Sequence, residues 1–513
     1  MARLFEFQSK ELLKRSGINI QRGKVCRSPA EAKAFCAELG CPVVIKAQVW
    51  FTGRAAVGGV QFADTPEEAE KKAANILGKT IRNFTITQVL VAEKLEIKRE
   101  LFASIIIDDG ARAPVLIFSE RGGSGVEEIA REHPESIVKK IINIRTGLYD
   151  FEALNIIRKF QFSEKVLMQL STVLVNLVKT TLKNEARAVE INPLVITEDE
   201  SVFALDARIT IDDYAVFRHP ELGITYAREL DNPPSPLDVL AYNIEKNDYR
   251  GTFYFIQMER GFSKGSGYIG FHGAGGGGSM MSMDAVLRRG YKPANFCDTS
   301  GNPPASKVYR AARIILSQKN IDGYFGSGSG VASQEQVQSA RGLVKAFIEE
   351  NLSVPAVIRL GGNMEEKAVE ILQSYTKGLP APVEGYKKDD SADFCAERFD
   401  ELVKTFKAQD NEKKPHVGLS RIDYSFKTMT GEVQFQYDLC AECSSKICIT
   451  ACTPHILKLE NDKPVLAIAE DEAKKGKCTE CLACELECRM LGNNGCYVYL
   501  PIENLEEIAA QSQ

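Results

Sequence analysis

The residues CTECLACELEC, 478–488, are the most restrictive segment of this 513-residue chain. Their four cysteines follow the spacing Cys-x2-Cys-x2-Cys-x3-Cys, which is typical of loops that ligate [4Fe–4S] clusters. The members of this quartet are Cys478, Cys481, Cys484 and Cys488. Zinc ribbons also use Cys-x2-Cys pairs, but not three such cysteines followed by a fourth after three residues. Iron–sulfur chemistry is therefore the favoured interpretation.

A second quartet lies upstream and differs by two extra residues before its third cysteine: Cys440, Cys443, Cys448 and Cys452. In two-cluster proteins of this kind, the fourth cysteine of each run ligates the other cluster. We therefore expect one cluster to be held by Cys440, Cys443, Cys448 and Cys488. We expect the other to be held by Cys478, Cys481, Cys484 and Cys452. Cys496 is left over and is interpreted as a plain thiol.

The composition is that of an ordinary globular protein with about three or four domains. The net charge of −5 comes from acidic and basic residues mixed along the chain, so neither nucleic acid nor a membrane is an expected partner. There is no apolar run of about 18 residues, and the N-terminus lacks the features of a secretory signal. Fourteen cysteines without an export signal favour metal-bound thiolates, a cytoplasmic location and an anaerobic host.

The order of apolar strands and amphipathic helices predicts an α/β and α+β multidomain chain. Residues 1–232 form the first predicted domain, and the prolines of Asn232–Pro236 mark its end. Residues 237–404 alternate strands and helices as a doubly wound parallel sheet does. A polar stretch, 405–431, is predicted as a linker, and the cysteine module occupies 432–513.

Lys46 follows an apolar stretch and precedes a turn that contains Gly53 and Arg54. A lysine beside a glycine-rich loop is suited to phosphate binding, because a point charge is joined by backbone N–H groups that can approach closely. A surface lysine before a loop is the alternative. Further along, Glu190, Asn192 and Asp206 lie on two predicted strands and could supply the oxygen ligands that Mg²⁺ prefers. Solvated polar groups at a sheet edge would explain these three equally well.

Two glycine-rich loops follow predicted strands in the second domain. The first is HGAGGGGS, 272–279, and the second is FGSGSG, 325–330. Glycines at a strand-to-helix turn let backbone N–H groups and the helix dipole reach an anion. Open α/β sheets bind ligands at this edge, so both loops are candidate binding elements, with a flexible loop as the alternative.

Residues 1 to about 385 resemble the β subunit of succinyl-CoA synthetase and its NDP-forming acyl-CoA synthetase relatives. VVIKAQVWFTGRAAVGGV (43–60) is similar to the nucleotide loop of that family, and VEINPLVI (189–196) with FALDAR (203–208) to its magnesium-binding strands. HGAGGGGSMMSMD (272–284), YKPANFCD (291–298) and VPAVIRLGGN (354–363) are similar to its CoA-ligase half, in the same order. The C-terminal module resembles two-cluster bacterial ferredoxins. The resemblance implies an ATP-grasp domain, a flavodoxin-like CoA-ligase domain and a ferredoxin-like 2×[4Fe–4S] domain.

The resemblance also implies site residues. The nucleotide, ATP/ADP or GTP/GDP, would be bound by Lys46, Gly53, Arg54, Glu93 and Glu100. Asn192 and Asp206 would hold Mg²⁺, and Glu190 would act in catalysis by steadying a phosphohistidine. The residues implied for substrate and phosphate binding are His272, Gly273, Gly275, Gly330, Val331 and Ala332.

In this family phosphate passes from the nucleotide to a histidine and then to an acid, and CoA attacks the acyl phosphate. That histidine lies on an α subunit, which also supplies the CoA site. None of the five histidines here matches the α-subunit loop, so a separate α-like partner is expected, in an αβ or α2β2 complex. The ferredoxin-like module implies a second partner, a ferredoxin-dependent oxidoreductase.

Two departures from the family pattern bear on function. Trp50, Phe51 and Thr52 interrupt the nucleotide loop, and its second lysine is lost. The loop 329–335 lacks the arginine that usually stands there, and a guanidinium would favour a second carboxylate through bidentate pairing. We therefore expect an acid other than succinate. The altered loop leaves an alternative open, an electron-transfer subunit whose ligase-like half is a docking or regulatory scaffold.

Overall fold

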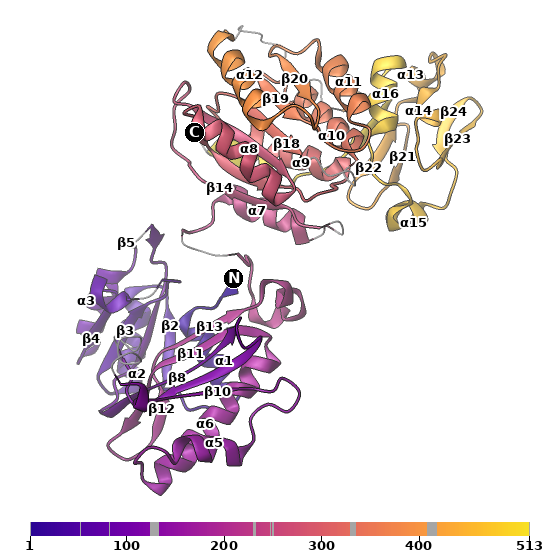
Figure 1. The fold of residues 1–513 in the computed structure, drawn as a ribbon. Helices are drawn as coiled ribbons and strands as arrows, with labels where there is room; N and C mark the ends of the chain where they lie inside the picture. The colour runs from indigo at the N-terminus through magenta and orange to yellow at the C-terminus, as the bar shows by residue number, and fades with distance from the viewer. Residues whose placement is uncertain are drawn as a thin grey trace. The chain divides into compact units, whose positions relative to one another are not determined.

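The computed structural model describes residues 2–51, 53–81, 83–123, 133–228, 232–246, 248, 251–328, 335–407 and 418–511. The chain divides into two compact units, Met1–Pro233 and Pro234–Gln513 (Figure 1). This division falls in the proline cluster that marks the first predicted junction. None of the described helices combines the length and the apolar composition needed to cross a bilayer.

The first unit contains a small antiparallel sheet in the order β2-β7-β3-β4. Its strands are β2 (Gly23–Cys26), β3 (Val43–Ala47), β4 (Val60–Ala63) and β7 (Val89–Glu93). Helices α2 (Pro29–Leu39) and α3 (Pro66–Ile76) pack together beside it. Each helix begins with an N-cap hydroxyl followed by proline, and Ser28 and Thr65 accept from the backbone N–H groups of the first turn. All of β3 is buried, so Lys46 is carried on a well-packed strand.

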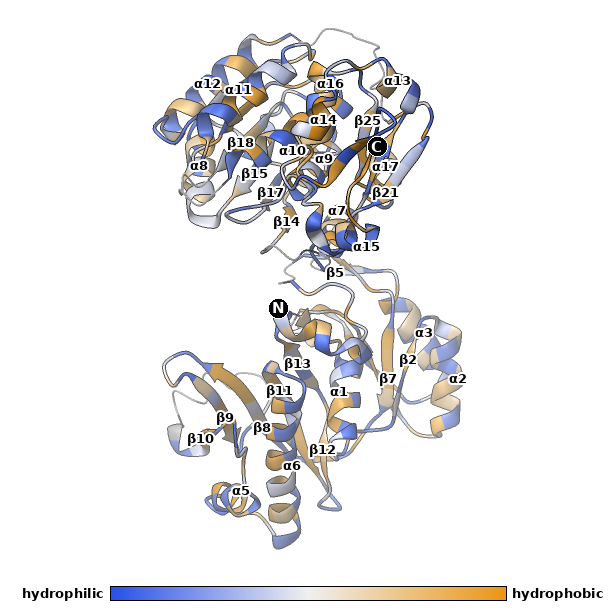
Figure 2. Cartoon of the chain, turned by 90° about the vertical axis from the view of Figure 1, so that its right-hand side faces the viewer, coloured by the Kyte–Doolittle hydropathy of each residue, from blue (hydrophilic) through white to orange (hydrophobic). Residues whose placement is uncertain are grey.

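A larger antiparallel sheet completes the first unit, in the order β1-β13-β11-β8-β9-β10. Its strands are β1 (Ala2–Arg3), β8 (Ile97–Asp108), β9 (Ala113–Ser119), β10 (Ile137–Ile141), β11 (Ala186–Thr197) and β13 (Ala207–Ile211). Helices α1 (Glu6–Arg15) and α6 (Glu164–Lys183) pack on this sheet, whose strand β8 is largely apolar in Figure 2. Because β1 pairs with β13, the start of α1 lies close to Asp206, the residue before β13.

The second unit is built on a sheet in the order β14-β17-β15-β18-β19-β20. Its strands are β14 (Tyr254–Gln257), β15 (Tyr268–Ala274), β17 (Asn295–Asp298), β18 (Tyr324–Gly328), β19 (Ala356–Arg359) and β20 (Val383–Tyr386), parallel except for β14. Phe325 packs with α8 (Gly276–Arg288) and α12 (Ala392–Thr405) on one face. Its neighbour Tyr324 packs with the helices of the other face, α9 (Ala305–Leu316), α10 (Gln336–Glu349) and α11 (Glu365–Thr376). Helices therefore cover both faces, as the doubly wound pattern predicts.

The cysteine module contains a three-stranded antiparallel sheet of β21 (Tyr424–Lys427), β22 (Glu432–Phe435) and β25 (Cys496–Tyr499). Its helices are α13 (Tyr437–Ala441), α14 (Ile447–Thr450), α16 (Ala483–Leu491) and α17 (Leu505–Gln511), and α17 packs against α7 (Pro236–Lys246). Strand β21 lies inside the stretch predicted as a linker. It pairs along its whole length with β22, so the sheet of the module begins before residue 432.

The module and the parallel-sheet domain share one apolar core, and a buried ion pair joins them. The Lys345 side chain on α10 is 1% exposed. Its Nζ lies 2.6 Å and 2.8 Å from the two carboxylate oxygens of Glu485 on α16, and 2.8 Å from Glu349 Oε1. The Tyr497 ring of β25 lies 4.1 Å from the same ammonium group. The module is thus packed into the unit and is not a tethered appendage.

Replacing Lys345 by Met should lower the free energy of unfolding of the second unit by about 3–5 kcal/mol, because Glu485 would stay buried without its cation. Guanidinium denaturation under anaerobic conditions, followed by far-UV circular dichroism, measures this change. The only tryptophan, Trp50, lies in the first unit, so its fluorescence transition should not move. Lys367→Met, which removes an exposed partner of Glu370, is the control. Coincident Lys345→Met and wild-type transitions would contradict this role.

Candidate functional site

The first unit gathers the candidate phosphate-binding residues around one buried carboxylate, that of Glu6. Lys46 Nζ lies 2.9 Å from Glu6 Oε1 and 2.8 Å from the Leu205 carbonyl oxygen. Arg54 Nη1 lies 2.8 Å from Glu6 Oε2, and Arg54 Nη2 lies 2.6 Å from Asp206 Oδ2. The structure therefore brings together Lys46, Arg54 and Asp206, three of the residues that the sequence singles out.

Lys10 adds a third cation to this cluster. Its Nζ lies 2.7 Å from Gln21 Oε1, 2.9 Å from the Leu205 carbonyl oxygen and 3.5 Å from Glu6 Oε1. Burial and the charge of Lys46 lower the pKa of Lys10 to about 8. Burial alone would raise the pKa of Glu6, but the surrounding cations outweigh it and hold that pKa well below its usual range. Three cations thus face two carboxylates, which leaves a net positive site suited to an anion.

Glu6 and Lys10 were not among the residues that the sequence predicted for the site. Both lie on α1 and are 5% and 3% exposed. A Glu–Lys pair spaced i,i+4 on an amphipathic helix is usually a solvated surface pair, so the spacing alone carries little information. Only the pairing of β1 with β13 brings this face of α1 to Lys46.

The loop after Lys46 turns back through two glycines in the left-handed region. Gly53 has φ 75° and Gly58 has φ 73°, on either side of a short 3-10 helix, Arg54–Val57. Trp50 stacks on Phe5 with ring centroids 4.5 Å apart, and both Trp50 and Phe51 pack against the core of the small sheet. The inserted aromatic residues are therefore partly buried in that core. Thr52 lies outside the described residues.

Glu100 and Asn192 meet at a second loop of the first unit. The Gly123 N–H donates to Asn192 Oδ1 at 2.9 Å, and a Cβ on Gly123 would lie 2.6 Å from Glu100 Oε2. The neighbouring Gly122 passes so close to β8 that a Cβ there would lie 2.1 Å from the Leu101 carbonyl oxygen. Only glycine fits such an approach. Glu190 stands on β11 opposite Ser104 and Arg208, two residues before Asn192.

Glu93 takes a separate position at the end of β7. Its carboxylate accepts from Arg22, from the backbone N–H at 2.8 Å and from Nε at 2.6 Å. In the β3–β7 register Lys46 faces Leu90, whereas Glu93 faces Val43 at the other end of β3. Glu93 is therefore not a member of the Lys46 cluster.

The candidate acid site of the second unit lies at the carboxyl end of β15. Gly275 N donates to Asp298 Oδ1 at 2.9 Å, and Gly276–Gly278 form the first turn of α8. Gly273 is closely packed, since a Cβ there would lie 2.5 Å from Ser279 Oγ. The predicted residues Gly330, Val331 and Ala332 lie outside the described residues.

His272 lies beneath this turn and is buried. Its Nδ1 is hydrogen-bonded to the Tyr324 hydroxyl, and its Nε2 lies 3.3 Å from Thr299 Oγ1. Burial lowers the pKa of His272 to about 3, so the ring is neutral at physiological pH. His272 therefore supplies a polar but uncharged surface, and it provides no cation for a second carboxylate.

The eight cysteines of the two quartets gather at the end of the second unit. Burial raises the pKa of Cys440 and Cys448, and the nearby Cys443 and Cys488 thiols raise it further. The Cys488 thiol therefore adjoins the first three cysteines of the upstream quartet, from which it is distant in sequence.

The thiols of the second expected set, Cys452, Cys478, Cys481 and Cys484, also lie near one another. Burial raises the pKa of Cys452, whose neighbours include Cys481 and Cys484, and the pKa of Cys478, which has the same two neighbours. The sets adjoin, because Cys484 also lies near Cys448 and Cys488. Cys496, interpreted from the sequence as a plain thiol, donates a hydrogen bond to Cys484 and so contacts the second set.

These two sets of four thiols fit cubane clusters better than single ions. Across the described parts of the chain, no three His, Cys, Asp or Glu side chains converge on a point that could hold one metal ion. A cubane distributes its four thiolates over four irons, so its ligands need not converge. Backbone N–H groups of residues 445, 446 and 493 bond Cys443, and those of residues 495 and 496 bond Cys488. Such donors stabilise thiolates and set cluster properties.

Comparison with known proteins shows relatives over about three quarters of the chain. Residues 3–196 match the ATP-grasp domain family. The β subunit of a GDP-forming succinate–CoA ligase from Thermus thermophilus is 38% identical over 371 residues, 72% of this chain and 93% of the relative. The β subunit of an ADP-forming succinate–CoA ligase from Chloroflexus aurantiacus is 37% identical over 381 residues, 74% of this chain and 95% of the relative.

A solved structure agrees with these relatives at the level of fold. The ATP citrate lyase of Methanothrix soehngenii, in complex with citrate and coenzyme A, superposes with a TM-score of 0.63. The superposition covers 76% of this chain and 97% of that chain at 18% sequence identity. The ATP-grasp and multidomain α/β parts of the predicted fold are confirmed.

The lowered pKa of Lys10 predicts a pH dependence for the Lys46 cluster. An ordinary lysine stays charged to about pH 10, whereas Lys10 loses its proton as pH rises through about 8. Affinity for Mg-ADP, the ligand that the family resemblance implies, should therefore fall between pH 7 and 9, by up to about tenfold. Calorimetry with Lys10→Met should show a flat profile over this range, and Lys14→Met on the exposed face of α1 should keep the wild-type slope. A flat wild-type profile would refute the assignment.

Proposed function

Since the chain belongs to the family of succinate–CoA ligase β subunits and is a subunit of an ADP- or GDP-forming CoA ligase, we propose a more specific activity. It is the β subunit of an acid–CoA ligase that acts on an acid other than succinate. Its partner is an α-like subunit that carries a phosphohistidine. The cysteine module couples this ligase to an oxidoreductase that makes or consumes the thioester.

The charge cluster around Glu6 carries this proposal. Lys46 and Arg54 are both paired with the buried Glu6 carboxylate, which would orient them for a phosphate group. Their charges would bind the phosphates of the nucleotide, with Gly53 giving the backbone close access. Asn192 and Asp206 would hold Mg²⁺, whose charge offsets that of the transferring phosphate. Glu190 on the same strand as Asn192 would orient the histidine of the partner.

The proposed reaction has three steps. The γ-phosphate moves from ATP to the histidine nitrogen of the partner and releases ADP. The phosphate then moves from nitrogen to a carboxylate oxygen of the acid, which gives an acyl phosphate. The CoA sulfur attacks the acyl carbon, and inorganic phosphate leaves. The Gly273–Gly278 turn, which opens α8, would face the phosphohistidine in the second step, because backbone N–H groups at the helix N-terminus can stabilise an anion.

The choice of an acid other than succinate rests on the absence of positive charge. The loop 329–335 carries no arginine, and the His272 ring is neutral and engaged by Tyr324 and Thr299. A second carboxylate in this site would lose its hydration without gaining a cation. A monocarboxylic acid avoids that cost.

The cysteine sets support two [4Fe–4S] clusters. Cys440, Cys443, Cys448 and Cys488 would hold one, and Cys452, Cys478, Cys481 and Cys484 the other. When bound, such clusters supply one-electron transfer. The chain contributes burial, N–H donors and the Cys496 hydrogen bond, and these tune the ligands.

The ligase proposal is tested with the chain reconstituted with its α-like partner. Label from γ-³²P-ATP should appear on the partner's histidine, and Lys46→Ala or Asp206→Ala should reduce this labelling at least about a hundredfold, as loss of a charge-stabilising group does. Lys71→Ala on the exposed face of α3 is the matched control. In a panel of acids, a monocarboxylate should drive CoA-dependent ADP release faster than succinate. Full labelling in both variants would exclude the nucleotide assignment, and a preference for succinate would exclude the substrate assignment.

The cluster proposal is tested by non-additive loss of iron. The chain purified anaerobically should contain about eight irons. The double variant Cys448→Ala with Cys488→Ala should retain about four irons per chain. Each single variant should retain the same number, because both changes remove ligands of one cluster. Cys448→Ala with Cys452→Ala should leave almost none. Cys41→Ala, a cysteine of the first unit, is the control. The opposite pattern in the two double variants would show that the fourth ligands are not exchanged.

A further inference from the structure

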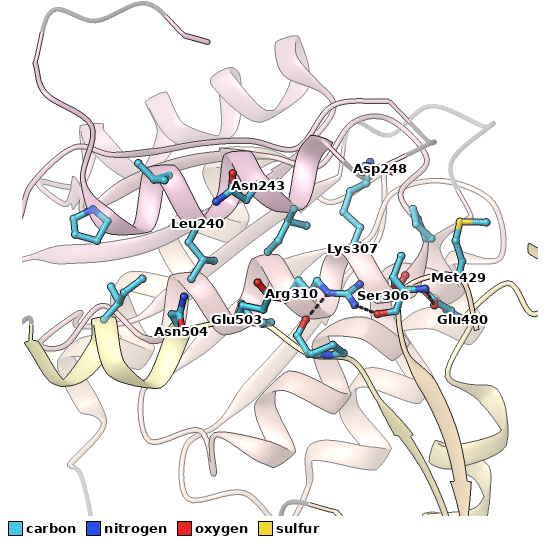
Figure 3. A pocket seen from close by; sticks show the side chains of 18 of the residues that line it. Leu240, Asn243, Asp248, Ser306, Lys307, Arg310, Met429, Glu480, Glu503 and Asn504 are labelled. Atoms are coloured by element: carbon cyan, nitrogen blue, oxygen red, sulfur yellow. Dashed lines mark hydrogen bonds and ion pairs between the residues drawn. The ribbon is translucent and has the colours of Figure 1, made fainter. Parts of the chain in front are cut away.

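A large cavity lies within the second unit, where the parallel-sheet domain meets the cysteine module (Figure 3). Its volume is about 810 Å³, within the range of small-molecule sites. Leu240 and Asn243 line it from α7, and Arg310 lines it from α9. Residues 429, 430, 480 and 501–504 close it from the module. The cavity exists only because both parts contribute walls.

Arg310 is a buried cation of the cavity; the charges of Glu480 and Asp248 act on it from nearby, without a direct ion pair. It is 6% exposed, and it donates from Nε to the Pro501 carbonyl at 3.2 Å and from Nη2 to the Thr430 carbonyl at 2.9 Å. Among the residues that the structure describes, no carboxylate forms an ion pair with it and no group accepts from Nη1. A buried guanidinium held only by neutral carbonyls retains an unmet preference for an anion.

Four other charged residues line the cavity: Asp248, Lys307, Glu480 and Glu503. Lys307 is paired with Asp248. Glu480 accepts hydrogen bonds from the Thr428 hydroxyl and from the Thr430 hydroxyl and backbone N–H, each at 2.7 Å. The three carboxylates of Asp248, Glu480 and Glu503 would repel a doubly charged phosphate, whereas Arg310 can accept a single negative charge. The polar end of the cavity therefore favours a monoanion.

The rest of the wall is apolar and suits an extended hydrophobic body. Val239, Leu240 and Ile244 line it from α7, and Ile502 and Ile508 from the C-terminal segment. In Figure 3, Leu240 and Asn504 lie on the far side of the cavity from Met429 and Glu480. We propose that this cavity binds an amphipathic monocarboxylate, with its carboxylate against Arg310 and its apolar body along α7.

Binding of a carboxylate at this site would affect the second cysteine set, which is Cys452, Cys478, Cys481 and Cys484. Thr430 accepts from Arg310 through its carbonyl and donates to Glu480 through its hydroxyl and N–H. Glu480 lies between Cys478 and Cys481 in the chain. The carboxylate would thus act as an effector of the cysteine module, in a site separate from the acid site at His272.

Calorimetry on the full chain, purified anaerobically, tests this proposal with 1-naphthylacetate as the probe. Two compounds serve as controls. Acetate has the carboxylate but lacks the apolar ring, and 1-naphthylacetamide has the ring but lacks the negative charge. Each should bind at least about tenfold more weakly than 1-naphthylacetate, since a hydrogen bond to a charged group is worth more than that factor. Equal binding of the acid and the amide, or no binding of the acid at millimolar concentration, would overturn the proposal.

Variants locate the probe. Arg310→Gln should weaken 1-naphthylacetate about tenfold or more. Asn243→Trp, at an exposed position on the cavity rim, should do the same by filling the space. If Arg310→Gln folds poorly, the Asn243→Trp variant alone tests whether the probe binds in this cavity. Arg288→Gln removes an exposed guanidinium paired with Asp393 and should bind normally. Lys46→Ala should also bind normally, which separates this site from the proposed ligase activity. Unchanged affinity in Asn243→Trp would place the probe elsewhere and refute the site.

Discussion

The ammonium group of Lys345 is buried between two helices and is neutralised by Glu485 and Glu349. Because an unpaired charge in this position would be very costly, α10 and α16 must stay together wherever the second unit is folded. The surrounding apolar core runs without a break from the parallel sheet to the cysteines. Everything in the module, including the walls of the cavity near Arg310, is positioned by that constraint. An electron partner would have to approach the module in place, since the module cannot swing away as a tethered carrier does.

The first unit also contains a buried cluster of ion pairs, which is centred on Glu6. Glu6 forms ion pairs with both Lys46 and Arg54, so two cations that would otherwise repel one another are held together. A phosphate group that enters this cluster meets groups already oriented, and the cost of ordering them has been met during folding. The inserted Trp50 and Phe51 pack into the core beside this cluster. The altered loop therefore does not by itself argue for a scaffold without ligase chemistry.

Hydrogen bonds distinguish the two chemistries proposed for this chain. In the ligase-like half, Gly276–Gly278 form the N-terminal turn of α8, where an anionic phosphate could use the backbone N–H groups. In the cysteine module, backbone N–H groups and the Cys496 thiol are directed at sulfur. Under the proposed function, the same kind of donor would serve a transient anion in one part and cluster ligands in the other. Thr430 and Glu480 connect the module to the cavity that the two parts share.

The sequence by itself determined the elements whose pattern is local. Its alternating strands and helices in residues 237–404 predicted the doubly wound parallel sheet, because strand alternation and helix periodicity depend on near neighbours. Tertiary structure decided the rest. Strand β21 lies in a polar stretch of the sequence, and it is defined by its antiparallel pairing with β22. Glu6 and Lys10 resemble a surface pair until β1 pairs with β13. Arg310 and Lys345 resemble ordinary helix cations until the module buries them, because burial and charge pairing depend on segments far apart in the chain.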